Sequence, residues 1–172
     1  MLSLGERIAL ERAPKRKDRA GRPLASVGDA AGKVWNLPNT VLGLGYGLAG
    51  HVAGELGRLR PGDQPNPRIQ LGHNAVEFLN NPAGGVSAMT LGNTTTYNDD
   101  PYVVPHKPFY MAHEQAHTIQ GQQLGPLYLP SNVAGGMLAS ARDGEWHGDH
   151  NWNERGPLTS PPRPWAPISR RK

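Results

Sequence analysis

The stretch that decides the fold is PFYMAHEQAHTIQGQQL, residues 108–124. It predicts a helix, because Pro108 suits the first helical turn, where its fixed backbone angle is already helical and its missing N–H needs no partner. Gly125-Pro126 follows directly and provides a stop. Apolar residues recur inside the stretch at three- and four-residue spacing, so one face of the helix is expected to turn toward the core.

This predicted helix carries the motif His113-Glu114-Gln115-Ala116-His117. Residues four apart lie on one face of a helix, so the two imidazoles can reach the same metal ion, with Glu114 one position round from His113. Two histidine ligands and a glutamate that activates water are the arrangement of zinc peptidases. The competing interpretation is two unrelated histidines with an incidental glutamate between them.

A catalytic zinc ion takes three protein ligands and a water molecule, so a third ligand must come from outside the motif. Residues 118–124 contain no further histidine. A later segment is dense in side chains that suit a third ligand or its hydrogen-bond partners. Its candidates are Asp143, Glu145, His147, Asp149, His150 and Glu154. The ordinary alternative for each is a solvated loop charge, and these residues alone leave the choice open.

The composition predicts a modest core. Hydrophobic residues make up 37% and aromatic residues 6% of the 172-residue chain, which also holds 22 glycines and 17 prolines. Such a chain is expected to have long loops, and a bound metal ion can supply part of its stability. The absence of cysteine excludes disulfides, thiolate zinc sites and a thiol nucleophile.

Charge divides the chain into three parts. The net charge is +4 over residues 1–23, −5 over 24–154 and +5 over 155–172. We therefore expect a basic, flexible N-terminal tail over 1–25, one domain over 26–157 and a Pro/Arg-rich basic tail over 158–172. Nucleic acid is not an expected partner, because no interleaved aromatic residues or binding motif accompany the basic tails. The N-terminus lacks the hydrophobic core of a signal peptide, so general secretory export is not expected.

Residues 34–54 contain no charged side chain, and this length matches a membrane span. Asparagine, proline and five glycines lower its hydrophobicity, so it predicts a helix over about 40–59 that packs tightly inside the domain. Gly43/Gly47 and Gly50/Gly54 have the spacing that lets helices approach closely. The G-x-G-x-x-G pattern within this segment lacks the strand and helix context of a dinucleotide site.

Short strands are expected at 68–71, 75–79, 86–91 and 94–97, with residues 80–85 turning the second strand into the third. A further helix is expected from near Ser131 to before Gly144. The pattern predicts an α+β domain that has a short antiparallel or mixed sheet, the motif-bearing helix and long loops.

Residues 113–130, HEQAHTIQGQQLGPLYLP, resemble the active-site segment of small zincin-like domains. Such domains occur in bacterial polymorphic-toxin and Rhs-associated proteins, often linked to type VI secretion. Shorter segments with the same resemblance are Trp35–Thr40, Leu91–Thr94, Trp146–Gly148, Asn151–Pro157 and Pro162–Trp165. The resemblance implies a zincin fold with bound Zn²⁺ and a gluzincin-like site. It assigns the third ligand to Glu154, ahead of His147 and His150.

The resemblance implies a zinc metallopeptidase in which Glu114 is the catalytic base. Candidates for supporting the ligands or stabilising an oxyanion are Gln120, Tyr128, Asn132, His147 and Asp149. The strand expected at 86–91 can hold a protein or peptide substrate as an added strand. An immunity or delivery protein is a further expected partner, and export from the bacterial cytoplasm by a type VI system is the expected route.

Two alternatives come from other classes of protein. One is a non-catalytic, zinc-stabilised interaction or delivery module, in which four protein ligands would close the metal site. The other is a membrane-active toxin that acts through residues 34–54, although the polar content of this segment favours a helix within the domain over membrane insertion.

Overall fold

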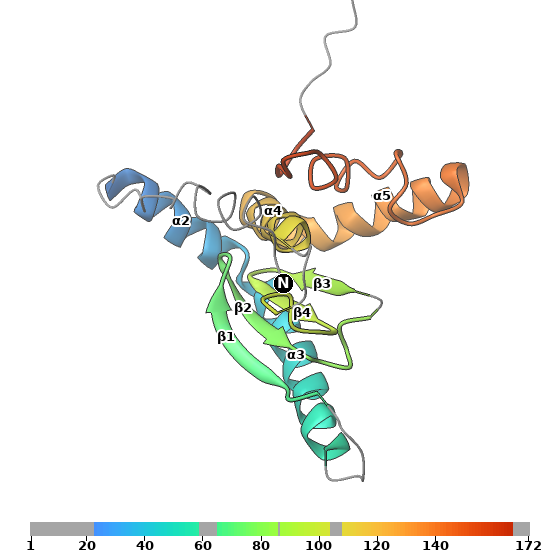
Figure 1. Cartoon of the computed structure of the whole chain (residues 1–172). Coiled ribbons are helices and arrows are strands. Elements are labelled where there is room, and N and C mark those ends of the chain that lie inside the picture. The colour runs from blue at the N-terminus through green and yellow to red at the C-terminus, as the bar shows by residue number, and fades with distance from the viewer. Residues whose placement is uncertain (1–22, 59–64, 86, 104–107, 167–172) are drawn as a thin grey trace, which may run out of the picture.

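The computed structural model describes residues 23–58, 65–85, 87–103 and 108–166, and these form an α+β fold (Figure 1). The helices are α2 (Pro23–Trp35), α3 (Leu37–Gly57), α4 (Pro108–Leu124) and α5 (Tyr128–Asp143), with the 3₁₀ turn η1 (Gly125–Leu127) before α5. The strands are β1 (Arg68–Gly72), β2 (Ala75–Leu79), β3 (Ala88–Leu91) and β4 (Thr94–Tyr97). The predicted α+β class is confirmed. Most of the predicted N-terminal tail and the end of the C-terminal tail lie outside the described residues.

The four strands form one mixed sheet in the order β1-β2-β4-β3. Two-residue turns close the β1–β2 and β3–β4 hairpins, in which Gly72 pairs with Ala75 and Leu91 pairs with Thr94. Positive φ angles at His73 (43°), Asn74 and Gly92 allow these tight turns.

Residues 80–85 leave β2 toward the third strand, as predicted, but β2 and β3 are not neighbours in the sheet. β2 pairs in parallel with β4, and β3 lies beyond β4 at the edge of the sheet. The connection instead crosses the end of β4, where Asn81 N donates to Tyr97 O at 2.9 Å and Asn98 N donates to Ser87 O at 3.0 Å. These bonds carry the chain past β4 and leave β3 with one free edge within the described sheet.

Helix α3 lies on one face of the sheet along a row of glycines. A Cβ atom at Gly47 would lie 2.4 Å from the Phe78 ring, and one at Gly43 would lie 2.8 Å from Thr94 Cβ. Phe78 and Thr94 point to the same face of the sheet, because Phe78 pairs with Thr96 and side chains alternate along a strand. The glycine spacing therefore serves close helix-to-sheet packing.

The opposite side of α3 is exposed. Val41, Leu48 and Val52 are 57%, 48% and 55% exposed. The predicted helix is confirmed, but the expectation that it packs tightly inside the domain is wrong on this side, because only its glycine face is covered. None of the helices in the part of the chain that the structure describes has the length and apolar character needed to cross a membrane.

Much of the buried interior is polar. Asn36 Nδ2 donates to Asn93 Oδ1 at 3.0 Å, and Asn39 Nδ2 donates to Asn36 Oδ1 at 2.9 Å and to Gly125 O at 2.7 Å. These asparagines are at most 7% exposed. They join the α2–α3 junction, the β3–β4 turn and the end of α4. Because buried polar groups are costly unless paired, this network specifies how the three parts meet.

We expect Gly47→Ala to destabilise the protein by about 1–3 kcal/mol, because the added methyl group must displace the Phe78 ring. Gly45→Ala is the matched control, since a Cβ atom there meets nothing within 4 Å. In a helix interior that change is expected to stabilise by roughly 0.5–1 kcal/mol. Urea unfolding of both variants measures the difference, and equal stabilities would contradict the packing described for α3.

Candidate metal centre

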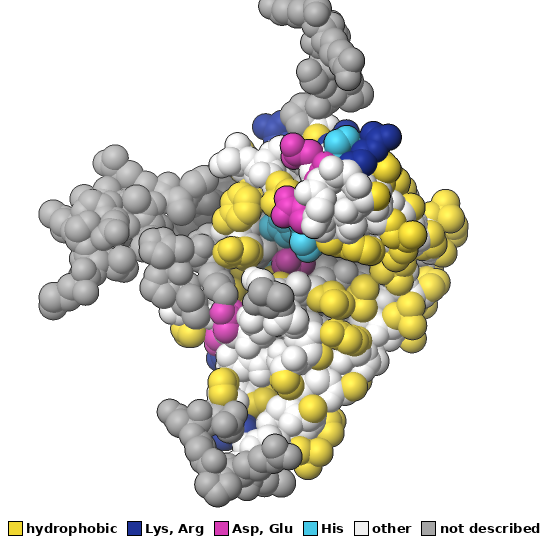
Figure 2. All heavy atoms as spheres, turned by 90° about the vertical axis from the view of Figure 1, so that its right-hand side faces the viewer, with side chains coloured by type: hydrophobic (Ala, Val, Ile, Leu, Met, Phe, Trp, Pro, Cys, Tyr) yellow, Lys and Arg dark blue, Asp and Glu magenta, His cyan; other side chains and the backbone are white. Residues whose placement is uncertain are grey.

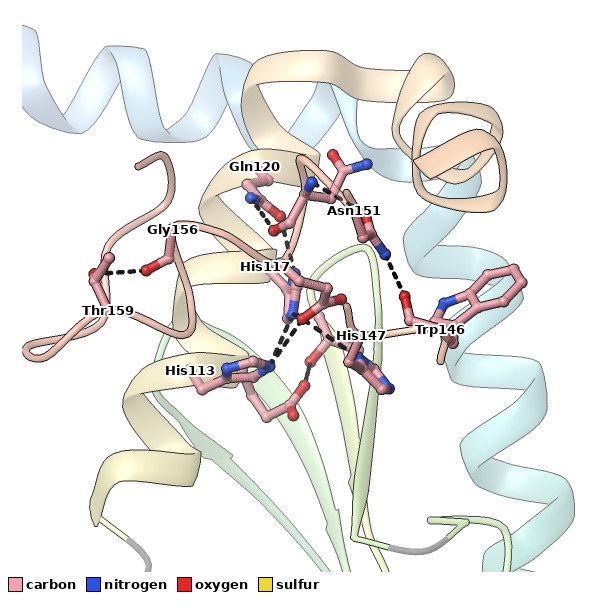
Figure 3. Close-up of polar contacts among 12 residues, drawn as sticks. His113, His117, Gln120, Trp146, His147, Asn151, Gly156 and Thr159 are labelled. Atoms are coloured by element: carbon pink, nitrogen blue, oxygen red, sulfur yellow. Dashed lines mark hydrogen bonds and ion pairs between the residues drawn. The ribbon is translucent and has the colours of Figure 1, made fainter. Parts of the chain in front are cut away.

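Helix α4 places His113 and His117 on the face that looks toward the C-terminal loop (Figure 3). Their Nε2 atoms are 3.1 Å apart. Glu154 Oε2 comes from that loop and lies 3.4 Å from each of the two Nε2 atoms. Helical spacing brings the histidines together, as the sequence predicts, and the loop adds the carboxylate.

The separations between these three atoms suit a metal ion. Ligand atoms bound tetrahedrally at 2.0–2.2 Å from one ion lie about 3.3 Å from one another. The described residues place one ligand atom each of His113, His117 and Glu154 within 4.8 Å of one another, and the side chains are 12%, 6% and 3% exposed. This buried His-His-Glu group could hold a metal ion.

Glu154 Oε2 supports the same interpretation. Among the described residues no hydrogen-bond donor serves this buried oxygen, although three histidine nitrogens lie near it. Burial raises the pKa of Glu154, but His117 and His147 outweigh burial and lower the pKa below its ordinary value. The carboxylate is therefore ionised at neutral pH and directed at the histidines, which is the state that a metal ligand requires.

The pKa values of the two histidines shift in opposite directions. Burial, followed by the neighbouring His117, lowers the pKa of His113 and favours its neutral form. Burial also lowers the pKa of His117, but Glu154 outweighs it and raises the pKa. His117 Nδ1 lies 2.9 Å from Gln120 Oε1, and the bond assigns the proton to Nδ1 because this amide oxygen only accepts. Nε2 of His117 is then free to bind a metal ion.

The loop that carries Glu154 is held by buried asparagines. Asn151 Nδ2 donates to Trp146 O at 3.1 Å, while the backbone N–H of Glu154 donates to Asn151 O at 3.0 Å. Gln120 Nε2 donates to Asn153 O at 2.7 Å, which ties the loop to α4. The Asn151-x-Asn153-Glu154 pattern thus has a physical role, because the Asn151 side chain and the Asn153 carbonyl hold the backbone that leads into the ligand.

Glu114 lies beside the histidines, and strand β3 holds its carboxylate. Thr90 Oγ1 donates to Glu114 Oε2 at 2.6 Å, and Thr90 Oγ1 lies 3.0 Å from Thr95 Oγ1 on β4. Thr90 is a site residue that sequence reasoning missed. A threonine in a short strand carries no local mark of such a role, and only the pairing of β3 with β4 brings it to α4.

The remaining predicted site residues divide into four groups. Gln120, described above, supports His117. Tyr128 and Asn132 line the cleft next to the cluster. His147 Nδ1 lies 3.4 Å from Glu154 Oε2, but its side chain is 66% exposed and it does not join the three-residue group.

His150 and Asp149 point elsewhere. The His150 side chain pairs with Asp143, whose other oxygen accepts from the His150 backbone N–H at 2.8 Å. Asp149 is exposed, and its backbone carbonyl accepts a bond from Arg155. The structure therefore does not bring these two side chains to the cluster. Their loop positions resemble that of Glu154 in the sequence, and only the fold separates them.

A cleft passes over the cluster, and Figure 2 shows histidine and carboxylate side chains in a recess flanked by hydrophobic ones. One side of the cleft has a volume of about 390 Å³ and contains Trp146; we call it the Trp146 side. The other has a volume of about 450 Å³ and contains Tyr110; we call it the Tyr110 side. His113, Glu114 and His147 line both.

A scan against protein-family models finds no match to this chain, and searches of curated proteins and of solved structures find none either.

We expect the purified protein to bind about one divalent transition-metal ion per chain, and Glu154→Gln to weaken binding because a neutral amide is a poor ligand. The loss in affinity should exceed the roughly 10–100-fold that follows removal of an outer-shell partner. Metal content and the metal-dependent rise in melting temperature are the measurements. Glu145→Gln is the control, as an exposed acid of the same loop. Equal affinities in the two variants would contradict the assignment of Glu154.

Proposed function

We propose that the protein is a zinc-dependent metallopeptidase of the zincin type. The observation that carries the proposal is the convergence of two histidine nitrogens and one carboxylate oxygen beside Glu114, in a cleft open to solvent. Nitrogen and oxygen ligands at these separations suit zinc, and three protein ligands are the number that catalytic zinc sites use. His113, His117 and Glu154 would hold the ion, which supplies a Lewis acid that makes bound water more acidic.

Glu114 would act as the general base and then as the general acid. It accepts a proton from the attacking water and returns it to the amine that leaves, so one residue serves both transfers. Thr90 already donates to Oε2 of Glu114, and we therefore assign the proton transfer to Oε1. The same bond keeps the carboxylate from rotating away between the two steps.

His147 is the residue we assign to the developing oxyanion. The Glu154 carboxylate, whose Oε2 lies 3.4 Å from His147 Nδ1, raises the pKa of His147, although burial opposes the shift. It lines the cleft on both sides of the cluster while remaining largely exposed. A ring N–H donor in that position can stabilise negative charge that forms on the carbonyl oxygen of the substrate.

The non-catalytic alternative requires a closed metal site. Four ligand atoms would then surround the ion, whereas the described residues bring together three, and the cleft adjoins them. These observations favour catalysis over a purely structural zinc site. The proposal that the enzyme is a bacterial effector, exported by a type VI system and opposed by an immunity protein, rests on the sequence resemblance alone.

We expect Glu114→Gln to reduce peptide hydrolysis by about 10²–10⁴-fold, because the amide cannot accept the proton of water. Metal content should remain unchanged, since Glu114 is not among the three converging ligands. Mass spectrometry of a complex peptide mixture incubated with the zinc-loaded protein measures the activity. Hydrolysis that persists at the wild-type rate in the variant would reject the mechanism.

Removal of the Thr90 hydroxyl should lower kcat by roughly tenfold and leave KM nearly unchanged, because the lost hydrogen bond orients the base and does not contact substrate. Thr90→Val tests this, and Thr90→Ser should recover most of the rate because it keeps the hydroxyl. If Thr90→Ser is as slow as Thr90→Val, the role belongs to packing of the methyl group and the assignment fails.

A further inference from the structure

The two sides of the cleft share a floor made by strand β3. Ala88 and Met89 line both sides, whereas Leu91 lines the Trp146 side alone and Ser87 lines the Tyr110 side alone. The strand therefore runs from the Tyr110 side, past Glu114, to the Trp146 side. Because β3 is the edge strand beyond β4, its outer edge is not paired by any strand of the described sheet.

The Trp146 side has apolar walls that the fold builds specifically. The indole of Trp146 lies on Gly136 of α5, where a Cβ atom would come within 2.1 Å of the ring. Only glycine lets the indole lie this close to the helix. Leu129 and Val133 continue the same wall, and Val133 is 47% exposed. This side can receive a large apolar side chain.

The Tyr110 side has walls of the same character. The rings of Phe109 and Tyr110 meet edge to face, with centroids 6.2 Å apart and an interplanar angle of 85°. Leu158 stands among the other lining residues and is 49% exposed, while Gly84 and Gly85 contribute lining without side chains. A second apolar side chain can be accommodated here.

Among the described residues that line the two sides, none outside the metal centre and its neighbours carries a charge that could select a charged substrate side chain. Among the described lining residues, the side chains that can carry charge near neutral pH are His113, Glu114, His117, His147 and Glu154, all of them in or beside the metal centre. A charged substrate side chain would lose hydration in either half and find no partner of opposite charge outside the catalytic group. Such burial is costly, so the cleft discriminates against it.

We infer that this peptidase cleaves between two uncharged residues with large apolar side chains, one on each side of the bond. The inference rests on the proposed peptidase function. A substrate that pairs antiparallel with β3 would place the residue before the bond on the Trp146 side and the residue after it on the Tyr110 side. Antiparallel pairing is the more stable arrangement for an added strand.

Cleavage sites in a complex peptide mixture, incubated with zinc-loaded wild-type protein, give the preference directly. We expect apolar residues to be enriched at both positions and charged residues to be disfavoured by roughly tenfold or more. Cleavage with charged residues at these positions as frequent as in the mixture would overturn the inference and leave the peptidase function standing. No cleavage of any peptide, with wild type and Glu114→Gln alike, would overturn both.

Two charge-introducing variants test the assignment of the sides by a gain of activity, which misfolding cannot imitate. Val133→Glu should increase cleavage of peptides with lysine before the bond by roughly tenfold, and Leu158→Glu should do so for lysine after the bond. Met137→Glu is the matched control, because Met137 lies one turn further along α5, is 63% exposed and does not line the cleft. Equal preferences for lysine in the three variants would overturn the assignment of the two sides. If Val133→Glu instead favours lysine after the bond and Leu158→Glu favours it before the bond, the substrate runs in the opposite direction and the antiparallel placement is overturned.

Binding provides a measurement that does not depend on turnover. Zinc-loaded Glu114→Gln should bind a labelled peptide with leucine on both sides of the central bond about tenfold more tightly than the same peptide with aspartate there. Fluorescence anisotropy measures both affinities. Equal affinities would contradict an apolar cleft, whatever the rate of hydrolysis.

Discussion

Burial of the Glu154 carboxylate against two histidines is the constraint on which the site depends. Removing an ionised carboxylate from water costs several kcal/mol in desolvation free energy, unless nearby charges and hydrogen bonds compensate. Here His113 and His117 face one oxygen at 3.4 Å, and that oxygen has no donor among the described residues. A metal ion at the centre would satisfy all three groups at once. The C-terminal loop, which supplies the carboxylate, is thereby tied to helix α4.

The scaffold around this constraint uses few large apolar side chains. Its interior relies on hydrogen-bonded asparagines and threonines and on glycines that bring α3 onto the sheet. Asn36 and Asn93 connect elements that are far apart in the sequence, at a bond length of 3.0 Å. Such an interior gains less hydrophobic free energy on folding than an apolar core does. Each buried polar group, however, must keep its specific hydrogen-bond partner, and this favours one arrangement of the elements. The result is a small domain whose geometry is specified by polar contacts, and metal binding would add to its stability.

The two faces of the sheet have different roles: one packs against α3 and the other contacts α4. Phe78 and Thr94 receive α3, while Thr90, on the other face, reaches Glu114 of α4. Strand alternation makes this division automatic, because neighbouring residues in a strand point to opposite faces. The same edge strand that holds the proposed base also forms the floor of the cleft. The four residues of β3 therefore fix both the position of Glu114 and the floor on which a substrate would lie.

Local pattern determined helix α4, the spacing of His113, Glu114 and His117, and the glycine row of α3, because each depends on residues a few positions apart in the sequence. The choice of Glu154 over His150 came from resemblance to known zincins, since both lie in one loop and both are ligand types. Tertiary structure decided which of them reaches the histidines: Asn151 and Asn153 fix the loop so that Glu154 turns inward, while His150 pairs with Asp143. The edge position of β3 and the role of Thr90 were likewise decided only by the path of the chain past β4, which no local pattern encodes.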